Sequence, residues 1–258
     1  MEMDNSPTKL DYHDDMWNLQ STATLVSHLK GDNGRHVLIL DRTIFYPQGG
    51  GQPADTGFIR IHGLDVKFLV HDVRSKDGIV LHYGFFEGFG EEFETMPEKG
   101  KEVSLFVDEN RRKLNSRLHS AGHLLDICLP KIGLGHLEPG KAYHFSDGPW
   151  VEYKGVIPQN EMQNKQKELE LEANALISMG GKVFVDILPY DEAATLCGGI
   201  LPNYVSKEST PRIVRIGDNP GCPCGGTHVL DLSDITKIKV SQIRSRKGLT
   251  KIYYNIES

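Results

Sequence analysis

The chain has 258 residues, of which 38% are hydrophobic and 25% charged, and its formal net charge at pH 7 is -6. Such a length holds one large domain or two modest ones, and the composition is that of a soluble globular protein. There is no run of about 18 apolar residues, so no membrane span is predicted. Residues 1–15 lack the features of a secretory signal or transit peptide, so we expect a cytoplasmic protein.

The cysteines and the charge restrict the possible classes further. Four cysteines (Cys128, Cys197, Cys222 and Cys224) are too few for a disulfide framework in a chain of this length. The negative net charge argues against binding long nucleic acid by bulk charge. Local basic clusters do occur, although charge alone favours a solvated surface for them: Arg111, Arg112, Lys113 and Arg117; Arg212 and Arg215; Arg244, Arg246, Lys247 and Lys251.

After a polar lead-in of about 20 residues, the segment from residue 23 to residue 107 favours short strands and contains no convincing long helix. Turn residues such as His62-Gly63 and Lys76-Asp77-Gly78 separate the apolar runs. Short strands at this spacing are typical of a small antiparallel barrel or sandwich. The predicted strands cover residues 37–40, 58–61, 66–70, 79–83 and 103–107.

A glycine-rich stretch, residues 43–57, interrupts these strands. Gly49, Gly50 and Gly51 are adjacent, which is costly in conformational entropy. They indicate either a constrained backbone, whose conformation is closed to other residues or which must lie against a partner, or a flexible hairpin, and the glycines alone do not decide between the two. The stretch is not a P-loop, because no Lys-Ser/Thr follows at the required spacing.

The pattern changes to a helical period after Asp108. Asp108 or Asn110 can cap a helix, and an apolar stripe then predicts a helix over residues 114–129, ended by Pro130. His119 and His123 lie about 100° from the centre of that stripe, at the edge of a core. Gly122 costs about 1 kcal/mol against alanine in mid-helix, so the space beside it has a use. The stripe consists of Leu114, Leu118, Ala121, Leu125 and Cys128.

The rest of the chain is expected to alternate between strands and helices. Residues 133–153 resemble a loop and hairpin. A second helix should follow, with Asn160 and Gln163 as a capping box, an apolar stripe of Met162, Leu169, Ala173 and Leu176, and a stop at Gly180-Gly181. A half-buried strand is expected where Val183, Val185 and Ile187 alternate with Phe184, Asp186 and Leu188. A short helix within residues 189–209 and strands over 213–216, 235–240 and 249–256 complete an α+β fold.

Two short motifs point to a metal site. The pair His119 and His123 falls at i, i+4 on the predicted helix, so both imidazoles share one face. Cys224 and His228 have the same spacing in a glycine-rich loop. Neither pair is specific by itself, but together they supply four nitrogen and sulfur ligands, which favour one Zn²⁺ over magnesium or calcium. The pattern of helical metalloproteases is excluded, because Ser120 stands where their general base would be.

Three motifs together are similar to those of alanyl-tRNA synthetase editing domains. They are His119-Ser-Ala-Gly-His123-Leu-Leu, Cys224-Gly-Gly-Thr-His228, and Phe45-Tyr-Pro-Gln-Gly-Gly-Gly-Gln52-Pro-x-Asp55-x-Gly57. The chain most resembles the free-standing alanyl-tRNA editing proteins that carry an N-terminal β-barrel. The resemblance implies a small antiparallel barrel over 1–109 and a two-layer α/β editing domain over 110–258, of the type shared by threonyl- and alanyl-tRNA synthetases.

The resemblance also implies an activity and its residues. The activity is hydrolysis of mischarged tRNA(Ala), chiefly Ser-tRNA(Ala), with Gly-tRNA(Ala) as a further candidate. His119, His123, Cys224 and His228 map onto the metal ligands and the catalytic site. Gly49, Gly50, Gly51 and Gln52 map onto a loop expected near the acceptor end of the tRNA. Cys222 departs from this pattern and is expected to be a spectator thiol rather than a competing ligand.

Editing of serine is chemically reasonable, because serine is alanine with an added hydroxyl. The apolar pocket in which alanine is activated rejects this hydroxyl poorly, whereas a separate hydrolytic site can hydrogen-bond it. Lys141, Tyr143 and His144 could line that second site or simply pack a hairpin. Zinc could activate water or orient the substrate, and the sequence does not separate these two roles.

The alternative functions are a non-catalytic zinc-stabilised tRNA-binding module and a zinc hydrolase of another small substrate. We expect a monomer.

Overall fold

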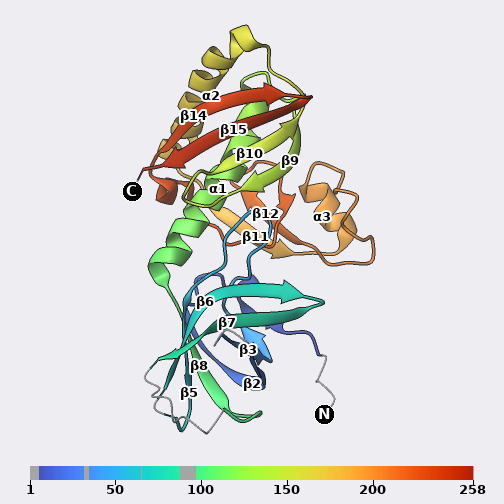
Figure 1. Ribbon diagram of the computed structural model, residues 1–258. Helices are drawn as coiled ribbons and strands as arrows, with labels where there is room; N and C mark the ends of the chain where they lie inside the picture. The colour runs from blue at the N-terminus through green and yellow to red at the C-terminus, as the bar shows by residue number, and fades with distance from the viewer. Residues whose placement is uncertain (1–5, 32–34, 65, 88–96, 258) are drawn as a thin grey trace. The chain divides into compact units, whose positions relative to one another are not determined.

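The computed structural model describes residues 6–31, 35–64, 66–87 and 97–257 (Figure 1). The chain forms two compact units. The first comprises Met1–Gly49 and Pro53–Arg112, and the second comprises Gly50–Gln52 and Lys113–Ser258. The predicted domain limits, 1–109 and 110–258, remain our proposal for the parts that fold independently. No described helix is long and apolar enough to cross a membrane.

The first unit is built on a closed antiparallel barrel of six strands, as predicted. Every neighbouring pair of barrel strands is antiparallel, and the order is β2-β3-β7-β6-β5-β8. The sequence prediction missed β2, in which buried Ala23 and Leu25 alternate with polar residues. The barrel strands are β2 (Gln20–Lys30), β3 (His36–Leu40), β5 (Gly57–Ile61), β6 (Lys67–Lys76), β7 (Ile79–Glu87) and β8 (Glu102–Val107).

The lead-in to the barrel is more ordered than the sequence indicated, apart from residues 1–5, which lie outside the described part of the chain. It contains β1 (Lys9–Leu10) and a 3-10 helix, η1 (Asp11–His13). Strand β1 pairs in parallel with β4 (Arg42–Thr43). Tyr12 is buried and its ring contacts Tyr46 edge to face, which ties the lead-in to the glycine-rich stretch.

A buried ion pair anchors the C-terminal side of the glycine-rich stretch within the first unit. The side chains of Asp55 and Arg112 are both fully buried, with Arg112 Nη2 2.6 Å from Asp55 Oδ2. Asp55 also accepts a hydrogen bond from the Tyr46 N–H, and Arg112 donates to the carbonyls of Ile44 and Met16. Because each charge is paired and hydrogen-bonded, removing either partner leaves a buried, uncompensated charge.

The barrel core also contains one buried imidazole, His82. Its Nδ1 lies 3.0 Å from the Leu38 carbonyl oxygen, so Nδ1 carries the proton and donates it. Its Nε2 therefore accepts from the Thr43 hydroxyl, 2.8 Å away. Burial lowers the pKa of His82 to about 4, because the charged form cannot be hydrated there.

This buried histidine predicts acid sensitivity of the barrel. The pKa of His82 in the folded state lies below its ordinary value, so the unfolded state takes up a proton first as the pH falls from about 6.5 to about 4. The histidine's contribution to stability is complete above that window and is lost within it. Wild type should therefore lose about 2 kcal/mol more stability between pH 7 and pH 5 than His82→Gln.

Urea denaturation measures this difference. In a Trp150→Phe background, fluorescence of Trp17, the other of the chain's two tryptophans, reports on the first unit. An equal loss of stability in wild type and His82→Gln between pH 7 and pH 5 would contradict the prediction.

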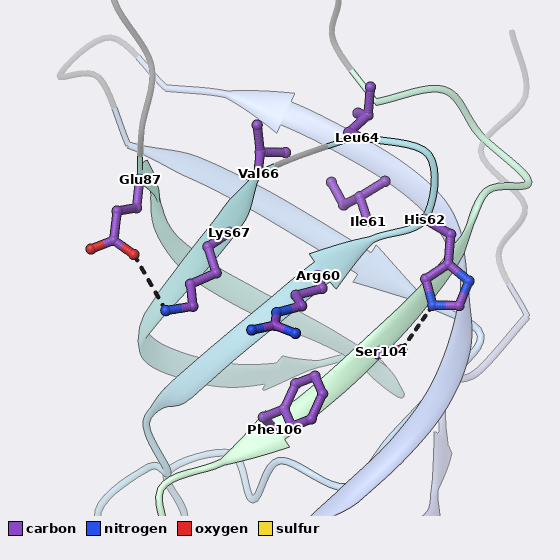
Figure 2. A pocket seen from close by; sticks show the side chains of 9 residues that line it. All are labelled: Arg60, Ile61, His62, Leu64, Val66, Lys67, Glu87, Ser104 and Phe106. Atoms are coloured by element: carbon purple, nitrogen blue, oxygen red, sulfur yellow. Dashed lines mark hydrogen bonds and ion pairs between the residues drawn. The ribbon is translucent and has the colours of Figure 1, made fainter.

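The barrel has a shallow cavity of about 650 Å³ on its surface (Figure 2). Its lining includes Arg60, Lys67, Glu87 and Phe106, with an ion pair of 3.6 Å between Lys67 and Glu87. None of the predicted site residues lines this cavity.

The second unit consists of an antiparallel sheet covered on one face by two long helices, α1 (Glu109–Lys131) and α2 (Gln159–Met179) (Figure 1). The sheet order is β14-β15-β10-β9. A second sheet, β11-β12-β13, and the short helix α3 (Tyr190–Leu196) complete the unit. The strands are β9 (Glu138–Tyr143), β10 (Trp150–Lys154), β11 (Val183–Ile187), β12 (Arg212–Ile216), β13 (Cys222–Pro223), β14 (Ile238–Arg246) and β15 (Leu249–Ile256), with η2 (Leu232–Ile235) before β14.

Helix α1 agrees with the predicted helix in most features. Asp108 caps it, since its carboxylate accepts a hydrogen bond from the Arg111 N–H at 3.1 Å. Four of the five stripe residues are buried, but Leu114 is 38% exposed, because it precedes the part of the helix that packs on the sheet. Pro130 lies inside the last turn rather than ending the helix.

One further prediction for the second unit was wrong. Helix α2 begins directly after Pro158, whose extended backbone serves as the N-cap without a side-chain hydrogen bond, so Asn160 already lies in the first turn and forms no capping box. Ile187 is 48% exposed, because it ends β11 beyond the edge of the core. The predicted strands over 213–216, 235–240 and 249–256 correspond to β12, β14 and β15, although η2 occupies the start of the second segment.

Candidate metal centre

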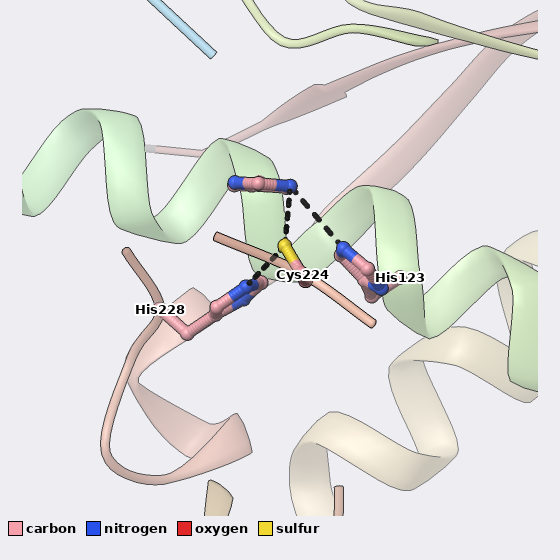
Figure 3. A group of neighbouring side chains, drawn as sticks. His123, Cys224 and His228 are labelled. Carbon is pink, nitrogen blue, oxygen red and sulfur yellow. Dashed lines mark hydrogen bonds between the residues drawn. The ribbon is translucent and has the colours of Figure 1, made fainter. Parts of the chain in front are cut away.

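Two pairs of side chains, distant in sequence, meet beside helix α1. His119 and His123 lie one turn apart on α1, and Cys224 and His228 come from the loop after β13. Figure 3 shows His123, Cys224 and His228 directed toward one another. One ligand atom from each of the four lies within 4.8 Å of all the others. The Nε2 atoms of His119 and His123 are 3.2 Å apart, and Cys224 Sγ lies 3.5 Å from His119 Nε2 and 3.4 Å from His228 Nε2.

These separations fit the edges of a zinc coordination tetrahedron. Bonds of about 2.0–2.1 Å to nitrogen and about 2.3 Å to sulfur place two nitrogens about 3.3–3.4 Å apart, and nitrogen and sulfur about 3.5–3.6 Å apart. These three of the six separations in the cluster agree with these values within a few tenths of an ångström, and all six are within 4.8 Å. The donor set of three imidazoles and one thiol is also one that zinc prefers.

The other nitrogen of each imidazole has a partner of its own. His119 Nδ1 donates to Gln52 Oε1 at 2.7 Å. His123 Nδ1 lies 3.0 Å from Cys222 Sγ, and His228 Nδ1 lies 3.1 Å from Ser120 Oγ. The Gln52 oxygen can only accept, so it places the proton of His119 on Nδ1 and directs the Nε2 lone pair into the cluster. The contacts of Cys222 and Ser120 hold the other two rings through the same nitrogen, which is how metal-binding histidines are usually held.

Burial keeps these groups neutral in the absence of a cation. It lowers the pKa of His123 to about 4 and lowers the pKa values of His119 and His228 well below the usual range, so all three rings carry a lone pair at neutral pH. Burial also raises the pKa of the Cys224 thiol, while a hydrogen bond from the Gly226 N–H opposes that shift. Neutral lone pairs that converge on one point are stabilised by a shared cation.

The glycine-rich stretch supplies Gln52, which is fully buried. Its Oε1 also accepts from the Thr227 N–H at 3.0 Å, and its Nε2 donates to the Thr227 hydroxyl at 2.9 Å. The amide therefore joins His119 to the loop that carries Cys224 and His228. Contact between Gln52 and a substrate stays a prediction, and the structure gives its amide this other use.

Gly51 has the close backbone approach that was one of the two expectations for the glycines. Its φ is +81°, and a Cβ at this position would lie 2.6 Å from the carbonyl oxygen of Ala142. Its own carbonyl accepts from the His144 N–H at 2.8 Å. The partner of this backbone lies within the chain, so tRNA contact by Gly50 and Gly51 stays a prediction. Gly49 accepts a hydrogen bond from the Tyr46 hydroxyl at 2.9 Å.

His144 lies directly beside the four-residue cluster. Its ring stacks on that of His119 with centroids 4.6 Å apart, and it is 2% exposed. The space beside Gly122 accommodates it, because a Cβ there would lie 2.3 Å from His144 Cε1, which confirms the predicted use of that glycine. His144 Nδ1 lies 2.6 Å from the Tyr254 hydroxyl, which donates in turn to the Leu118 carbonyl.

The other predicted pocket residues point elsewhere. Lys141 is exposed, and Tyr143 hydrogen-bonds Asp147 through its hydroxyl at 3.0 Å. Side chains alternate along β9, and the residue between them, Ala142, packs on the core. Lys141 and Tyr143 therefore lie on the face of the sheet opposite to His144, so only His144 of the three reaches the metal cluster.

Two of the three basic clusters have structural partners. Arg112 forms the buried ion pair in the first unit, and Arg117 donates to the carbonyls of Ile235 and Glu257. Arg212 is 7% exposed and donates to the carbonyls of Cys224 and Gly226, which shapes the cysteine loop. The solvated surface that charge alone favours for these clusters is therefore wrong for Arg112 and Arg212, which are buried.

Ser120 escaped the sequence prediction as a residue of the site, and it contacts His228. Cys222 contacts His123 through Nδ1, and its expected role as a spectator to the metal stays a prediction. Asn115 precedes His119 by one turn, so the three residues 115, 119 and 123 share a face of α1. It is 4% exposed, and its Nδ2 has no hydrogen-bond partner among the described residues. Its i−4 spacing from His119 places it on that face already in the sequence, whereas its unpaired donor is visible only in the structure.

Comparisons with known proteins agree with the motifs. The sequence profile of class II (A) tRNA synthetases matches residues 4–111. The alanyl-tRNA editing protein AlaX-L of Pyrococcus horikoshii is 32% identical over 247 residues, which are 94% of this chain and 56% of that protein. The chain is a relative of the alanyl-tRNA editing proteins. This confirms the resemblance inferred from the three motifs.

Alanine–tRNA ligases are similar to the same extent. That of Methanosarcina acetivorans is 30% identical over 253 residues, and that of Korarchaeum cryptofilum is 31% identical over 259 residues. Each alignment covers 96% of this chain but about a quarter of the ligase (25% and 26%). The chain thus spans about half the length of the editing protein and about a quarter of these ligases.

The hydrogen bonds to Nδ1 predict the strength of metal binding. Loss of such an outer partner commonly costs about 10–100-fold in metal affinity. We expect Gln52→Ala to weaken zinc binding by that factor, because the His119 ring loses its orientation. Competition with a chromogenic chelator measures the affinity. Gln48→Ala is the control, because Gln48 is exposed in the same stretch. Equal affinities for the two variants would contradict this role.

Proposed function

We propose that the chain is a zinc-dependent hydrolase that deacylates mischarged tRNA(Ala), chiefly Ser-tRNA(Ala), with Gly-tRNA(Ala) as a further candidate substrate. The observation that carries the proposal is the cluster of His119, His123, Cys224 and His228, with each imidazole oriented through Nδ1. We expect the protein to act as a monomer in the cytoplasm, with one zinc ion bound by these four residues.

In this proposal the metal ion and the surrounding residues have different roles. A bound zinc ion supplies Lewis acidity for polarising the ester or orienting the substrate amine. His144 is buried against His119, and burial lowers its pKa to about 3, so it is neutral at physiological pH. Because His144 Nδ1 donates to the Tyr254 hydroxyl, Nε2 is left as the acceptor and can take a hydrogen bond from water or from a substrate hydroxyl.

Asn115 supports selection of serine over alanine. Its Nδ2 is a buried donor that lacks a partner among the described residues, on the face of α1 that carries His119 and His123. A serine hydroxyl can accept a hydrogen bond from this donor, whereas alanine leaves it unpaired. A buried donor left without a partner costs about 1–3 kcal/mol, which is enough to separate the two aminoacyl groups by one or two orders of magnitude.

The alternative function is a non-catalytic tRNA-binding module in which zinc is structural. Four protein donors around one metal favour it, since structural zinc sites are closed by four protein ligands. The buried, unpartnered Asn115 donor favours a pocket for a polar ligand and hence the hydrolase.

Deacylation of Ser-tRNA(Ala) and Ala-tRNA(Ala) separates the two functions. Wild type should cleave the seryl ester, and Cys224→Ala should lower the rate at least about 100-fold, because it removes a ligand of the catalytic metal. Cys197→Ala is the matched control and should keep the wild-type rate, since Cys197 lies outside the cluster. Binding of tRNA by wild type without cleavage faster than the blank would favour the non-catalytic module.

Replacement of Asn115 tests the source of specificity. We expect Asn115→Leu to lower kcat/KM for Ser-tRNA(Ala) about tenfold while leaving zinc content unchanged, because one neutral hydrogen bond to the substrate is lost. The measurement is the ratio of kcat/KM values for the seryl and alanyl esters. A ratio equal to that of wild type would show that Asn115 does not read the hydroxyl.

A further inference from the structure

The face of the β14-β15-β10-β9 sheet that turns away from the two helices has an unusual composition. Buried residues of these strands, such as Val151, Ile252 and Tyr254, belong to the core that α1 and α2 share. Their neighbours along each strand therefore point to the other face. In register across that face, Tyr143 pairs with Trp150, and Trp150 pairs with Tyr253.

The aromatic side chains on this face lie against one another. The rings of Tyr143 and Phe145 are stacked with centroids 4.3 Å apart, and those of Tyr143 and Trp150 are nearly parallel with centroids 6.1 Å apart. All of them, like Tyr253, are only half-buried. Buried apolar contacts do not account for a row of large aromatic rings on an exposed sheet face.

Cations accompany the rings. Lys251 Nζ lies 3.5 Å from the centroid of the Trp150 ring, and the Arg244 guanidinium lies 5.7 Å from that of Tyr253. Arg244 and Lys251 are themselves cross-strand neighbours. Lys141, Lys154 and Arg246 lie on the same face by strand alternation, so basic groups outnumber the acidic ones there. The acidic groups are Glu152 beside Lys251, Asp147 beside Tyr143, and Glu138, which pairs with Lys154.

We propose that these six residues, the aromatic platform, bind an unpaired segment of RNA. The platform is Tyr143, Phe145, Trp150, Tyr253, Arg244 and Lys251. Bases stack on half-exposed rings and phosphates pair with the adjacent cations, and this combination, rather than cations alone, is what single-stranded nucleic acid requires. In the third basic cluster of the sequence, Arg244, Arg246 and Lys247 are exposed, and Lys251 lies over the Trp150 ring and 3.6 Å from Glu152.

The position of the platform relates it to the metal centre. Tyr143 and His144 are consecutive residues on opposite faces of the sheet, and β9, which ends at Tyr143, is an edge strand. The same holds for Tyr253 and Tyr254 on β15, where Tyr254 holds His144. An unpaired RNA strand that crosses the edge of the sheet at β9 can thus contact both faces. This step rests on the proposed function, in which the reacting end of a tRNA enters the metal centre.

Binding of an RNA that carries no aminoacyl group tests the platform independently of ester hydrolysis. The probe is a single-stranded RNA dodecamer, compared with the same sequence as a duplex. In a Trp17→Phe background, Trp150 is the remaining tryptophan and reports on stacking. We expect the single strand to quench its fluorescence and to bind more tightly than the duplex. Tyr253→Ala should weaken binding about tenfold, and Tyr253→Phe should restore it, because stacking needs only the ring.

The salt dependence of RNA binding tests whether the cations of the platform contact phosphates. Arg244→Ala with Lys251→Ala should reduce the slope of log Kd against log salt by about 1.4, because two phosphate contacts to single-stranded RNA are lost. Lys167→Ala with Lys182→Ala removes the same charge from exposed positions elsewhere in the second unit and should leave the slope unchanged. Circular dichroism and zinc content check that each variant is folded.

The outcomes separate the platform from the proposed enzyme. No quenching, equal binding of the duplex, or wild-type affinity in Tyr253→Ala would overturn the platform, and a protein partner would then be the better occupant of this face. Failure of the proposed function appears in a different experiment, as the absence of ester cleavage by wild type. An enzyme that cleaves Ser-tRNA(Ala) with normal KM after Tyr253→Ala would retain its function and exclude the platform from substrate binding.

Discussion

The hydrogen bonds of Gln52 are the constraint on which the candidate site depends. One buried amide accepts from His119 on helix α1 and is paired twice with Thr227 in the cysteine loop. The amide comes from a segment of three residues that belongs to the second unit although its flanks belong to the first. Gln52 thereby fixes the direction of one ligand and the position of the loop that carries two others.

Close packing around the imidazoles explains why the motifs contain glycine and serine. A Cβ on Gly226 would lie 2.1 Å from His119 Cε1, and one on Gly122 would collide with His144. Ser120 is small enough to lie between α1 and the loop, where it accepts from the Val229 N–H and contacts His228. The short side chains of the motifs thus leave room for rings and supply the polar atoms that orient them.

The second unit uses its main sheet for two purposes. Residues that point toward the helices form the core and hold His144, whereas their neighbours along the strands carry aromatic and basic groups. Strand alternation makes this possible at no cost in chain length, because successive side chains leave opposite faces. One pair of adjacent residues, Tyr143 and His144, therefore connects the proposed RNA surface with the candidate metal centre.

Periodicity and short motifs in the sequence were enough to predict many of the structural elements and the candidate metal ligands. The helical period around His119, the i, i+4 spacing of both ligand pairs and most barrel strands follow from local chain geometry, which the sequence carries directly. The errors were also local. Leu114 fits the stripe by period but lies before the packed part of α1, and Pro158 replaced the predicted capping box.

Only the tertiary structure decided which groups meet. The separations in sequence between Gln52 and His119, Cys222 and His123, and Ser120 and His228 range from 67 to 108 residues, and no spacing rule connects them. Folding likewise gave Arg112, Arg117 and Arg212 structural roles in place of the solvated surface that charge alone favoured, because each reaches an acceptor that folding brings near. Local sequence specifies elements and donor types, whereas partners and burial depend on contacts between distant segments.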